Sequence, residues 1–295
     1  MRSITLHAPA KVNLFLKVYP KRPDGYHDLF TLFERIDLCD TITISGIPSG
    51  IEVVSDVPIT LDPRDNLVYK AAILVLKRAK IRRGVRIRIR KRIPIAGGLG
   101  GGSSDAASTL IGITRLYRTG LSPQQLIRIG AGLGADIPFF LLDRPVALGT
   151  GKGDQLMPLP RARKWWHVVV NPGFGVSTKE VYGAYDRMAP ARLTGSRHND
   201  KIPRYCKIQA SSDSFETMMS NDLEPVVVRK HKVIGTIIQR LAIASGRKAL
   251  LSGSGPSVFC LCPTRKEAMI TRRRFLSSPS ATAHGWQVFV AGTKV

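Results

Sequence analysis

A glycine-rich stretch at residues 94–107 has the composition of a phosphate-binding site. It reads Pro-Ile-Ala-Gly-Gly-Leu-Gly-Gly-Gly-Ser-Ser-Asp-Ala-Ala and runs from a predicted strand into a predicted helix. Glycine lets the backbone adopt positive φ and approach a ligand closely, and the first N–H groups of a helix stabilise negative charge. A purely structural turn is the alternative, but five glycines followed by two small hydroxyls favour phosphate binding. The stretch is not a Walker loop, because it lacks the Gly-Lys-Ser or Gly-Lys-Thr ending.

Two charged residues elsewhere have the types that phosphoryl transfer needs. Asp136 follows a predicted helix end, and a carboxylate can orient an acceptor hydroxyl and take its proton. Lys11 lies in a predicted strand, with Asn13 two residues on and therefore on the same face. The residue pattern alone favours a turn or cap role for Asp136 and a surface role for Lys11.

An aromatic pair, Tyr26 and His27, follows a Pro-Asp-Gly turn. Such an exposed pair usually packs on the surface. A ring face with a neighbouring imidazole is also what a nucleobase requires, since it supplies stacking and edge hydrogen bonds. The other histidines show no paired metal-ligand spacing.

The elements that must position these residues follow from hydrophobic periodicity and capping signals. In the amino-terminal half we expect strands at 10–19, 38–47 and 85–93, and helices at 67–80, at about 104–117 and from Ser122 to near 132–134. Asp65 or Asn66 is expected to cap the first of these helices. In the carboxyl-terminal half we expect strands at 168–170, 249–251, 258–261 and 287–290, and helices from Ser177, at 222–244 and at 265–275. Residues 195–214 are polar and aperiodic, which indicates a loop, and the change of character near 158 predicts domains at 1–157 and 158–295.

Length and composition restrict the class of protein. The 295 residues, 43% of them hydrophobic, are enough for two packed domains without a disulfide framework. Four cysteines without a CxxC pair indicate a reducing compartment. Neither a signal peptide nor an apolar run long enough to span a bilayer is evident, so we expect a cytoplasmic protein without a membrane segment.

The charge is unusual, because 45 Lys and Arg against 21 Asp and Glu give +24. Ten basic residues lie between Lys77 and Arg92, and such a patch could attract a polyanion. Within it, however, apolar and arginine residues alternate over 85–90, which is typical of a half-buried strand with one solvated face. Aromatic residues are not interleaved there, so nucleic-acid binding is not expected despite the charge.

Three motifs in sequence order resemble those of the GHMP kinases, a family that phosphorylates galactose, homoserine, mevalonate and other small molecules. They are residues 8–14 (Ala-Pro-Ala-Lys-Val-Asn-Leu), the stretch at 94–107, and residues 251–259 (Leu-Ser-Gly-Ser-Gly-Pro-Ser-Val-Phe). Residues 23–27 and 134–140, Gly-Ala-Asp-Ile-Pro-Phe-Phe, look like the branch that phosphorylates the 2-hydroxyl of 4-diphosphocytidyl-2-C-methyl-D-erythritol on the methylerythritol phosphate route to isoprenoids. The resemblance extends from residue 4 to about 292.

The resemblance implies an α+β two-domain GHMP kinase fold. Its amino-terminal ATP domain would be like domain 2 of ribosomal protein S5, and its carboxyl-terminal domain would be ferredoxin-like. It also implies ATP as co-substrate and Mg²⁺, with Ser103 or Ser104 as candidate ligands. ATP would contact Pro94, Ile95, Ala96, Gly97, Gly98, Leu99, Gly100, Gly101, Gly102, Ser103 and Ser104, with Asn66 and Leu67 at the adenine and 253–255 closing against the loop.

The same resemblance assigns catalysis to Asp136 as base and to Lys11 as the neighbouring cation. Substrate contacts would come from Asn13, Tyr26, His27, Thr178 and Tyr182, with the cytosine between the two tyrosine rings. We expect a monomer or homodimer. The alternatives are a GHMP kinase of the homoserine or mevalonate type and, from a different class, an RNA-binding protein.

Overall fold

The computed structural model describes residues 2–159, 164–188, 216–277 and 285–294. Contacts divide the chain into two compact units. The first unit comprises Met1–Ala10, Leu38–Ile95 and Gly100–Asp143, and the second comprises Lys11–Asp37, Ala96–Leu99 and Arg144–Val295. Two long strands, β1 (Ser3–Lys21) and β2 (His27–Ile47), contribute residues to both units. A single cut at 158 therefore does not coincide with the compact units, and as a folding boundary it stays a prediction.

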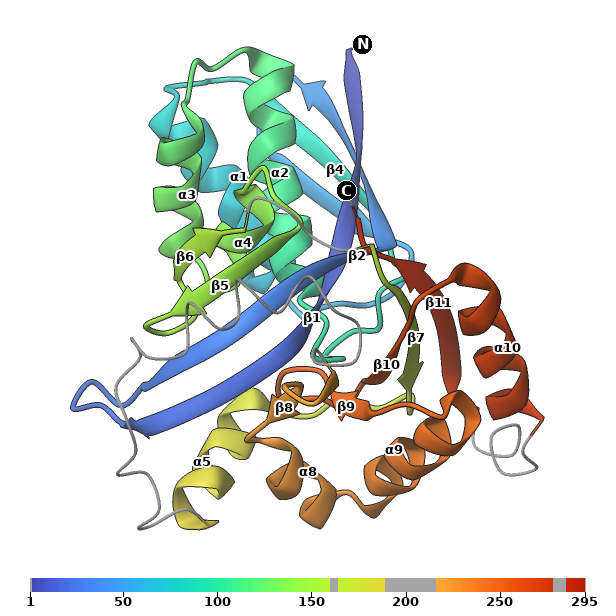
Figure 1. Cartoon of the computed structure of the whole chain (residues 1–295). Coiled ribbons are helices and arrows are strands. Elements are labelled where there is room, and N and C mark those ends of the chain that lie inside the picture. Colours follow the sequence, from blue (N-terminus) through green and yellow to red (C-terminus); the bar gives the residue numbers. More distant parts are fainter. Residues whose placement is uncertain (1, 160–163, 189–215, 278–284, 295) are drawn as a thin grey trace. The chain divides into compact units, whose positions relative to one another are not determined.

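The first unit is a sheet with helices on one face (Figure 1). Its strands lie in the order β3 (Ile51–Ser55), β4 (Gly84–Arg90), β2 and β1. The helices are α1 (Leu67–Arg78), α2 (Gly101–Tyr117), α3 (Pro123–Ala131) and α4 (Ile137–Leu141). Strand β4 buries Val85, Ile87 and Ile89 and exposes Arg88 and Arg90, which confirms the predicted half-buried strand.

Helix boundaries in this unit follow local capping. Asn66 caps α1, with Oδ1 accepting from the amide of Val68 at 2.9 Å. Ser122 and Gln125 form the predicted capping box of α3. Helix α2 begins at Gly101 rather than at the predicted Ser104, because Gly100 turns the chain with φ of 70° directly before it.

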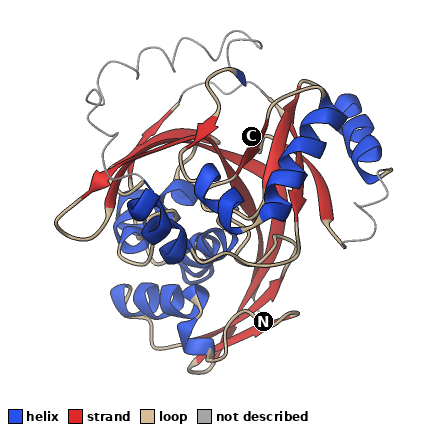
Figure 2. Cartoon of the chain, turned by 90° about the horizontal axis from the view of Figure 1, so that it is seen from below, coloured by secondary structure: helices blue, strands red, loops and turns tan. Residues whose placement is uncertain are grey.

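The second unit contains two β structures. In one, β5 (Val146–Thr150) pairs with β2 and with β6 (Gln155–Pro158), and β8 (Ser220–Asn221) pairs with β1. The other is an antiparallel sheet in the order β11 (Gln287–Gly292), β7 (Trp166–Asn171), β10 (Val258–Cys262) and β9 (Ala249–Leu251). Its helices are α5 (Thr178–Met188), α8 (Glu224–Lys230), α9 (Lys232–Ser245) and α10 (Arg265–Leu276). Figure 2 shows this mixture of long strands and helices.

The predicted helix at 222–244 is two helices, α8 and α9. His231 separates them, because its φ of −127° and ψ of 83° are not helical. Apolar periodicity continues through His231, so the break could not be read from it.

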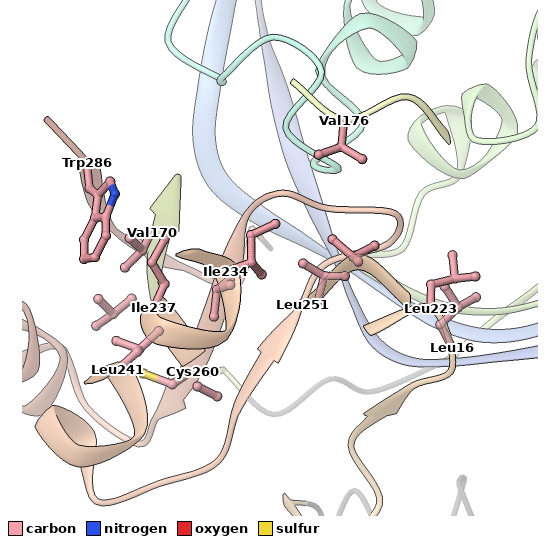
Figure 3. Close-up of a cluster of buried hydrophobic side chains, with 14 of the residues drawn as sticks. Leu16, Val170, Val176, Leu223, Ile234, Ile237, Leu241, Leu251, Cys260 and Trp286 are labelled. Atoms are coloured by element: carbon pink, nitrogen blue, oxygen red, sulfur yellow. The ribbon is translucent and has the colours of Figure 1, made fainter. Parts of the chain in front are cut away.

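A hydrophobic core holds the second unit together (Figure 3). Leu16 of β1, Ile237 and Leu241 of α9, and Leu251 and Cys260 of the antiparallel sheet are buried in one cluster. Burial of one such side chain contributes about 1.5–3 kcal/mol. This core fixes β9 and β10, and therefore the turn at 252–257 that connects them.

Some sequence predictions fall outside the described residues. The predicted loop at 195–214 lies entirely outside them. Among the helices that the structure describes, none has the length and apolar character needed to cross a membrane.

Candidate functional site

A buried hydrogen-bonded chain in the second unit fixes Lys11. Its Nζ donates to Oδ1 of Asn13 at 2.6 Å and lies 5.4 Å from the centroid of the Phe33 ring. Nδ2 of Asn13 donates to Oγ1 of Thr31 at 2.8 Å, and that hydroxyl donates to the carbonyl of Phe15. Lys11 is only 5% exposed. The predicted surface role of Lys11 is thus excluded, and Asn13 uses both ends of its amide to hold the chain together.

The middle of the glycine-rich stretch is fastened to the turn between β9 and β10. The carbonyl of Gly97 accepts from the amide of Ser257 at 3.1 Å, and that of Gly98 accepts from Oγ of Ser252 at 3.1 Å. Gly98 has φ of 75°, and a Cβ there would lie 2.3 Å from the carbonyl oxygen of Ser252. A Cβ on Gly253 would lie 3.3 Å from Nζ of Lys11. Lys11 of the first motif, residues 97–99 and the turn of the third motif therefore lie together within the second unit.

The end of the stretch, which begins α2, belongs to the first unit. Gly101 is buried, and a Cβ there would lie 3.0 Å from the Ile93 side chain. Gly102 is exposed, and a Cβ there would meet only Leu67, at 3.9 Å. Ser103 is half-buried, whereas Ser104 is fully buried and its Oγ has no hydrogen-bond partner within the described residues. At this helix start Gly102 is thus exposed, and Gly100 and Ser103 on either side of Gly101 and Gly102 are half-buried.

Three buried charges lie beside this helix start. Nζ of Lys91 donates to Oδ2 of Asp40 at 2.5 Å and to Oδ2 of Asp105 at 2.8 Å. Oδ1 of Asp40 accepts from the amides of Arg92 and Ile93 at 2.5 and 2.9 Å. Burial raises the pKa of Asp105 to about 7, opposed by Lys91 and reinforced by Asp40. The strand β4 ends at Arg90 instead of the predicted Ile93 because these two amides bond to a carboxylate.

Asp136 immediately precedes α4 in the first unit. It is half-buried, and its side chain makes no capping hydrogen bond to that helix. Helix α4 packs on α2 and α3. The side chain of Ile137 lies so close to Gly130 that a Cβ there would be 2.7 Å from Cγ2 of Ile137. The capping role that the residue pattern favoured is therefore absent from Asp136.

The rings of His27 and Tyr182 are in tilted contact in the second unit. Their ring centroids are 5.4 Å apart with an interplanar angle of 31°. Nδ1 of His27 lies 2.7 Å from the carbonyl oxygen of Tyr19, which requires a hydrogen on that nitrogen. Nε2 lies 2.9 Å from Oδ1 of Asp186, although its direction does not satisfy a hydrogen bond. These contacts orient His27 beneath the Tyr182 ring.

Tyr26 is more exposed than His27 and Tyr182, with 57% of its surface accessible. Nζ of Lys152 lies 3.7 Å from the centroid of its ring, and the same nitrogen lies 3.3 Å from Oδ2 of Asp24. Thr178 is also exposed, and its hydroxyl lies 2.9 Å from that of Ser254 in the third motif. A flat aromatic face and a pair of hydroxyls are thus available to a ligand in this unit.

The predicted site residues are divided between the two units. The first unit contains Pro94, Ile95, Gly100–Ser104, Asn66, Leu67 and Asp136, and the second contains Lys11, Asn13, Ala96–Leu99, Tyr26, His27, Thr178 and Tyr182. The sequence did not reveal Thr31, Lys152, Asp186 or the cluster of Lys91, Asp40 and Asp105. A polar residue such as Asp40 inside an apolar strand was the available signal. Within the described residues no cluster of three His, Cys, Asp or Glu side chains could hold a metal.

Comparison with known families gives two matches in sequence order. Residues 66–144 match the GHMP kinases N terminal domain, and residues 208–277 match the GHMP kinases C terminal domain. A 4-diphosphocytidyl-2-C-methyl-D-erythritol kinase from Geobacter metallireducens is 44% identical over 91% of this chain and 92% of its own. One from Pelobacter propionicus is 40% identical over 99% of this chain and all of its own.

Solved structures agree with the sequence comparison. A crystal structure of 4-(cytidine 5′-diphospho)-2C-methyl-D-erythritol kinase is 33% identical, with a TM-score of 0.79 over 99% of this chain and 100% of that one. Homoserine kinase from Cytophaga hutchinsonii is 18% identical with a TM-score of 0.74 over 100% and 95%, a likeness of fold. The predicted α+β GHMP kinase fold is confirmed. The chain belongs to the GHMP kinase family and, within it, to the 4-diphosphocytidyl-2-C-methyl-D-erythritol kinases.

Proposed function

We propose that this chain transfers the γ-phosphoryl group of ATP to the 2-hydroxyl of 4-diphosphocytidyl-2-C-methyl-D-erythritol, on the methylerythritol phosphate route to isoprenoids. The observation that carries the proposal is the 44% identity to a kinase of that name over nine-tenths of the chain. The solved homoserine and mevalonate kinases share the fold at 18% identity or less. Similarity at that level supports homoserine or mevalonate as the substrate much less than the 44% identity supports the cytidyl alcohol.

Asp136 is the proposed base. Direct transfer requires a carboxylate that orients the acceptor hydroxyl and accepts its proton as the new O–P bond forms. The place of Asp136 supports this role, because it is half-buried directly before α4, within the Gly-Ala-Asp-Ile-Pro-Phe-Phe motif. In this direct transfer the protein forms no covalent bond to the phosphoryl group; its own chemical step is the acceptance of the hydroxyl proton by Asp136.

Lys11 is the proposed cation that stabilises negative charge in the transition state. A preorganised cation in a water-poor site is more effective than one in bulk water. Its 5% exposure and its 2.6 Å hydrogen bond to Asn13 support this, because both hold the ammonium in one place. Asn13 would then act chiefly by positioning Lys11, in addition to any contact with substrate.

Residues 94–104 are the proposed ATP phosphate site, with Asn66 and Leu67 near the adenine. Gly102 is the glycine with open space, and Ser103 is the accessible hydroxyl. Ser103 fits a Mg²⁺ ion held mainly by phosphate oxygens and water, whereas the complete burial of Ser104 disfavours it. When bound, Mg²⁺ would neutralise charge on the transferred phosphate.

Cytosine recognition is assigned to Tyr26 and Tyr182 as stacking faces, to His27 at the base edge and to Thr178 as a further contact. The contact between the His27 and Tyr182 rings and the 57% exposure of Tyr26 support this assignment. Aromatic side chains provide most of the stacking energy for a base, while hydrogen bonds select its edge.

We further propose that the enzyme acts in the cytoplasm, as a monomer or homodimer, and without nucleic acid. A reaction between two soluble small molecules needs no other partner. Size-exclusion chromatography with light scattering tests the oligomeric state. An RNA gel shift at physiological salt in a preparation without ATP turnover would contradict the absence of nucleic acid.

The test of the proposed function is an ADP-release assay with the cytidyl alcohol, followed by phosphorus NMR of the product. We expect stoichiometric ADP and a new phosphomonoester at the 2-position. ADP release that does not depend on the alcohol, or a phosphate at another position, would contradict it.

A further inference from the structure

The buried cluster of Lys91, Asp40 and Asp105 has no part in the reaction proposed above. We infer that these three are positioning residues that fix the start of α2 for the ATP phosphates. The inference rests on the proposed binding of phosphate by residues 100–104.

The first step concerns the chain that enters the glycine-rich stretch. Asp40 lies in β2 and is completely buried. It accepts the amides of Arg92 and Ile93, the two residues directly before Pro94. A carboxylate that accepts backbone N–H groups forms strong, short hydrogen bonds. Asp40 therefore fixes where the stretch leaves the sheet.

The second step concerns the chain that leaves the stretch. Asp105 begins the second turn of α2, directly after the two serines, and is 2% exposed. Lys91 donates to Asp105 and to Asp40 with the same nitrogen. One ammonium group thus ties residues 91–93 to residue 105, across the segment between them.

The third step is that the first turn of α2 has no side-chain cap. Gly100 provides no side-chain cap, so the usual hydroxyl or carboxylate at that position is missing. A cap would occupy the N–H groups that a phosphate needs. An anchor placed behind the helix, at Asp105, leaves those groups free.

The fourth step explains the glycine at 101. A Cβ at that position would lie 3.4 Å from Nζ of Lys91 and 3.0 Å from Ile93. Glycine lets the first turn of the helix lie directly against the ammonium group. Gly101 is therefore part of the positioning device, whereas Gly102 faces the space available to a ligand.

A purely structural role is the competing explanation, since removal of one partner from any buried ion pair leaves an uncompensated charge. The chain offers a matched control in the second unit. Glu34 is 1% exposed, lies 3.1 Å from Nε2 of the buried His167, and accepts from Oγ1 of Thr293. Loss of that carboxylate should lower stability without a selective effect on ATP.

The experiment compares Asp105→Ala with Asp105→Asn, and Glu34→Ala with Glu34→Gln. Each variant is melted, and its KM for ATP, its KM for the cytidyl alcohol and its kcat are measured. Asp105→Asn keeps an oxygen for Lys91 and should stay within about threefold of the parent in KM for ATP. Asp105→Ala should raise that KM by about tenfold or more, while KM for the alcohol changes less than twofold.

If Asp105→Ala does not fold, the neutral combination of Lys91→Met, Asp40→Asn and Asp105→Asn replaces it, because it leaves no buried charge unpaired. The same selective rise in KM for ATP is expected. An unchanged KM for ATP in a folded variant of either kind, or an equal rise in both KM values, would overturn the inference. A parent enzyme without ATP-dependent turnover would instead overturn the proposed function.

Discussion

The two proposed binding regions differ in what holds their residues in place. At the start of α2, in the first unit, buried charges do so: Lys91, Asp40 and Asp105 are 7% exposed or less. At the proposed cytosine region, in the second unit, aromatic rings, single hydrogen bonds and a partly exposed ion pair do so: Tyr26 is 57% exposed, and the side chains of Lys152 and Asp24 are 34% and 40% exposed. The two regions therefore rely on different physical interactions.

The two regions should therefore differ in how strongly a substitution affects ligand binding. A phosphate site needs N–H groups aimed within a narrow geometry, and buried ion pairs provide that rigidity at a cost in desolvation. A base needs mainly a flat apolar face, which an exposed ring supplies and which tolerates small shifts. Changes in the first region should affect ATP steeply, and changes in the second should affect substrate choice moderately.

The largest effect is expected at Asp136, which we propose as the base of the chemical step. Asp136→Asn keeps the shape of the side chain and removes its basicity, so kcat should fall by ~10²–10⁴-fold. The measurement is steady-state ADP release. Asp143→Asn, a change at an exposed aspartate seven residues on, is the control and should retain parent activity. Near-full activity of Asp136→Asn would exclude it as base.

The next effect is expected at Lys11. Lys11→Met keeps most of the side-chain volume and removes the charge, so kcat should fall by ~10²–10³-fold, as for loss of one transition-state donor. Asn13→Ala should give a smaller loss, because it frees Lys11 from its 2.6 Å hydrogen bond without removing the ammonium group. If Asn13→Ala costs more than Lys11→Met, Asn13 contacts the substrate directly and its positioning role is secondary.

Substitutions at two adjacent glycines, Gly101 and Gly102, test the proposed phosphate region. Gly102→Val places a branched side chain where a Cβ would meet only Leu67, so ATP binding should weaken about tenfold with little loss of thermal stability. Gly101→Val would press on Ile93 and on Nζ of Lys91, so it should lower the melting temperature as well as weaken ATP binding. Nucleotide titration and melting curves separate the two. An unchanged ATP dissociation constant for folded Gly102→Val would mark the stretch as structural.

In the cytosine region, Tyr26→Ala and Tyr182→Ala should each reduce selection for the cytidyl substrate by ~1–3 kcal/mol, the usual value of a stacked base. Tyr26→Phe is the matched control, because it keeps the ring. The measured quantity is the ratio of kcat/KM between the cytidyl alcohol and base-free methylerythritol phosphate. A ratio that Tyr26→Ala leaves unchanged would break the assignment of this ring to the base.

The smallest effect concerns pH. The pKa of Asp105 is raised from 3.8 to about 7, so the folded state binds this proton more tightly than the unfolded state. Its contribution to stability is complete below the unfolded pKa and is lost as the pH rises through about 7. Asp105→Asn removes the titrating carboxyl group and with it this pH-dependent contribution to stability. The stability of the variant relative to the parent, from urea unfolding, should therefore increase between pH 4 and pH 8; a constant difference would contradict the raised pKa.

Much of the fold was accessible from the sequence because its signals are local. The capping box of Ser122 and Gln125, the alternation through Val85 to Arg90 and the cap of α1 require only neighbouring residues. The glycine-rich stretch was recognised for the same reason. The break at His231 was missed because an apolar helical pattern continues through it.

Residues whose role depends on distant contacts could not be found in this way. Thr31 and Asn13 are 18 positions apart, and Lys91 and Asp40 are 51 apart. Their pairing depends on strand neighbours and helix packing, which one sequence does not specify. The different roles of Gly101 and Gly102 likewise appear only once α2 is packed beside Ile93.

The most direct test of the central claim is the ratio of kcat/KM for 4-diphosphocytidyl-2-C-methyl-D-erythritol to that for base-free methylerythritol phosphate, measured for the parent enzyme at saturating ATP. A base recognised by Tyr26, Tyr182 and His27 predicts a strong preference for the cytidyl alcohol, and little turnover of homoserine or mevalonate. Equal values for the two methylerythritol compounds, or better turnover of homoserine or mevalonate, would contradict the account.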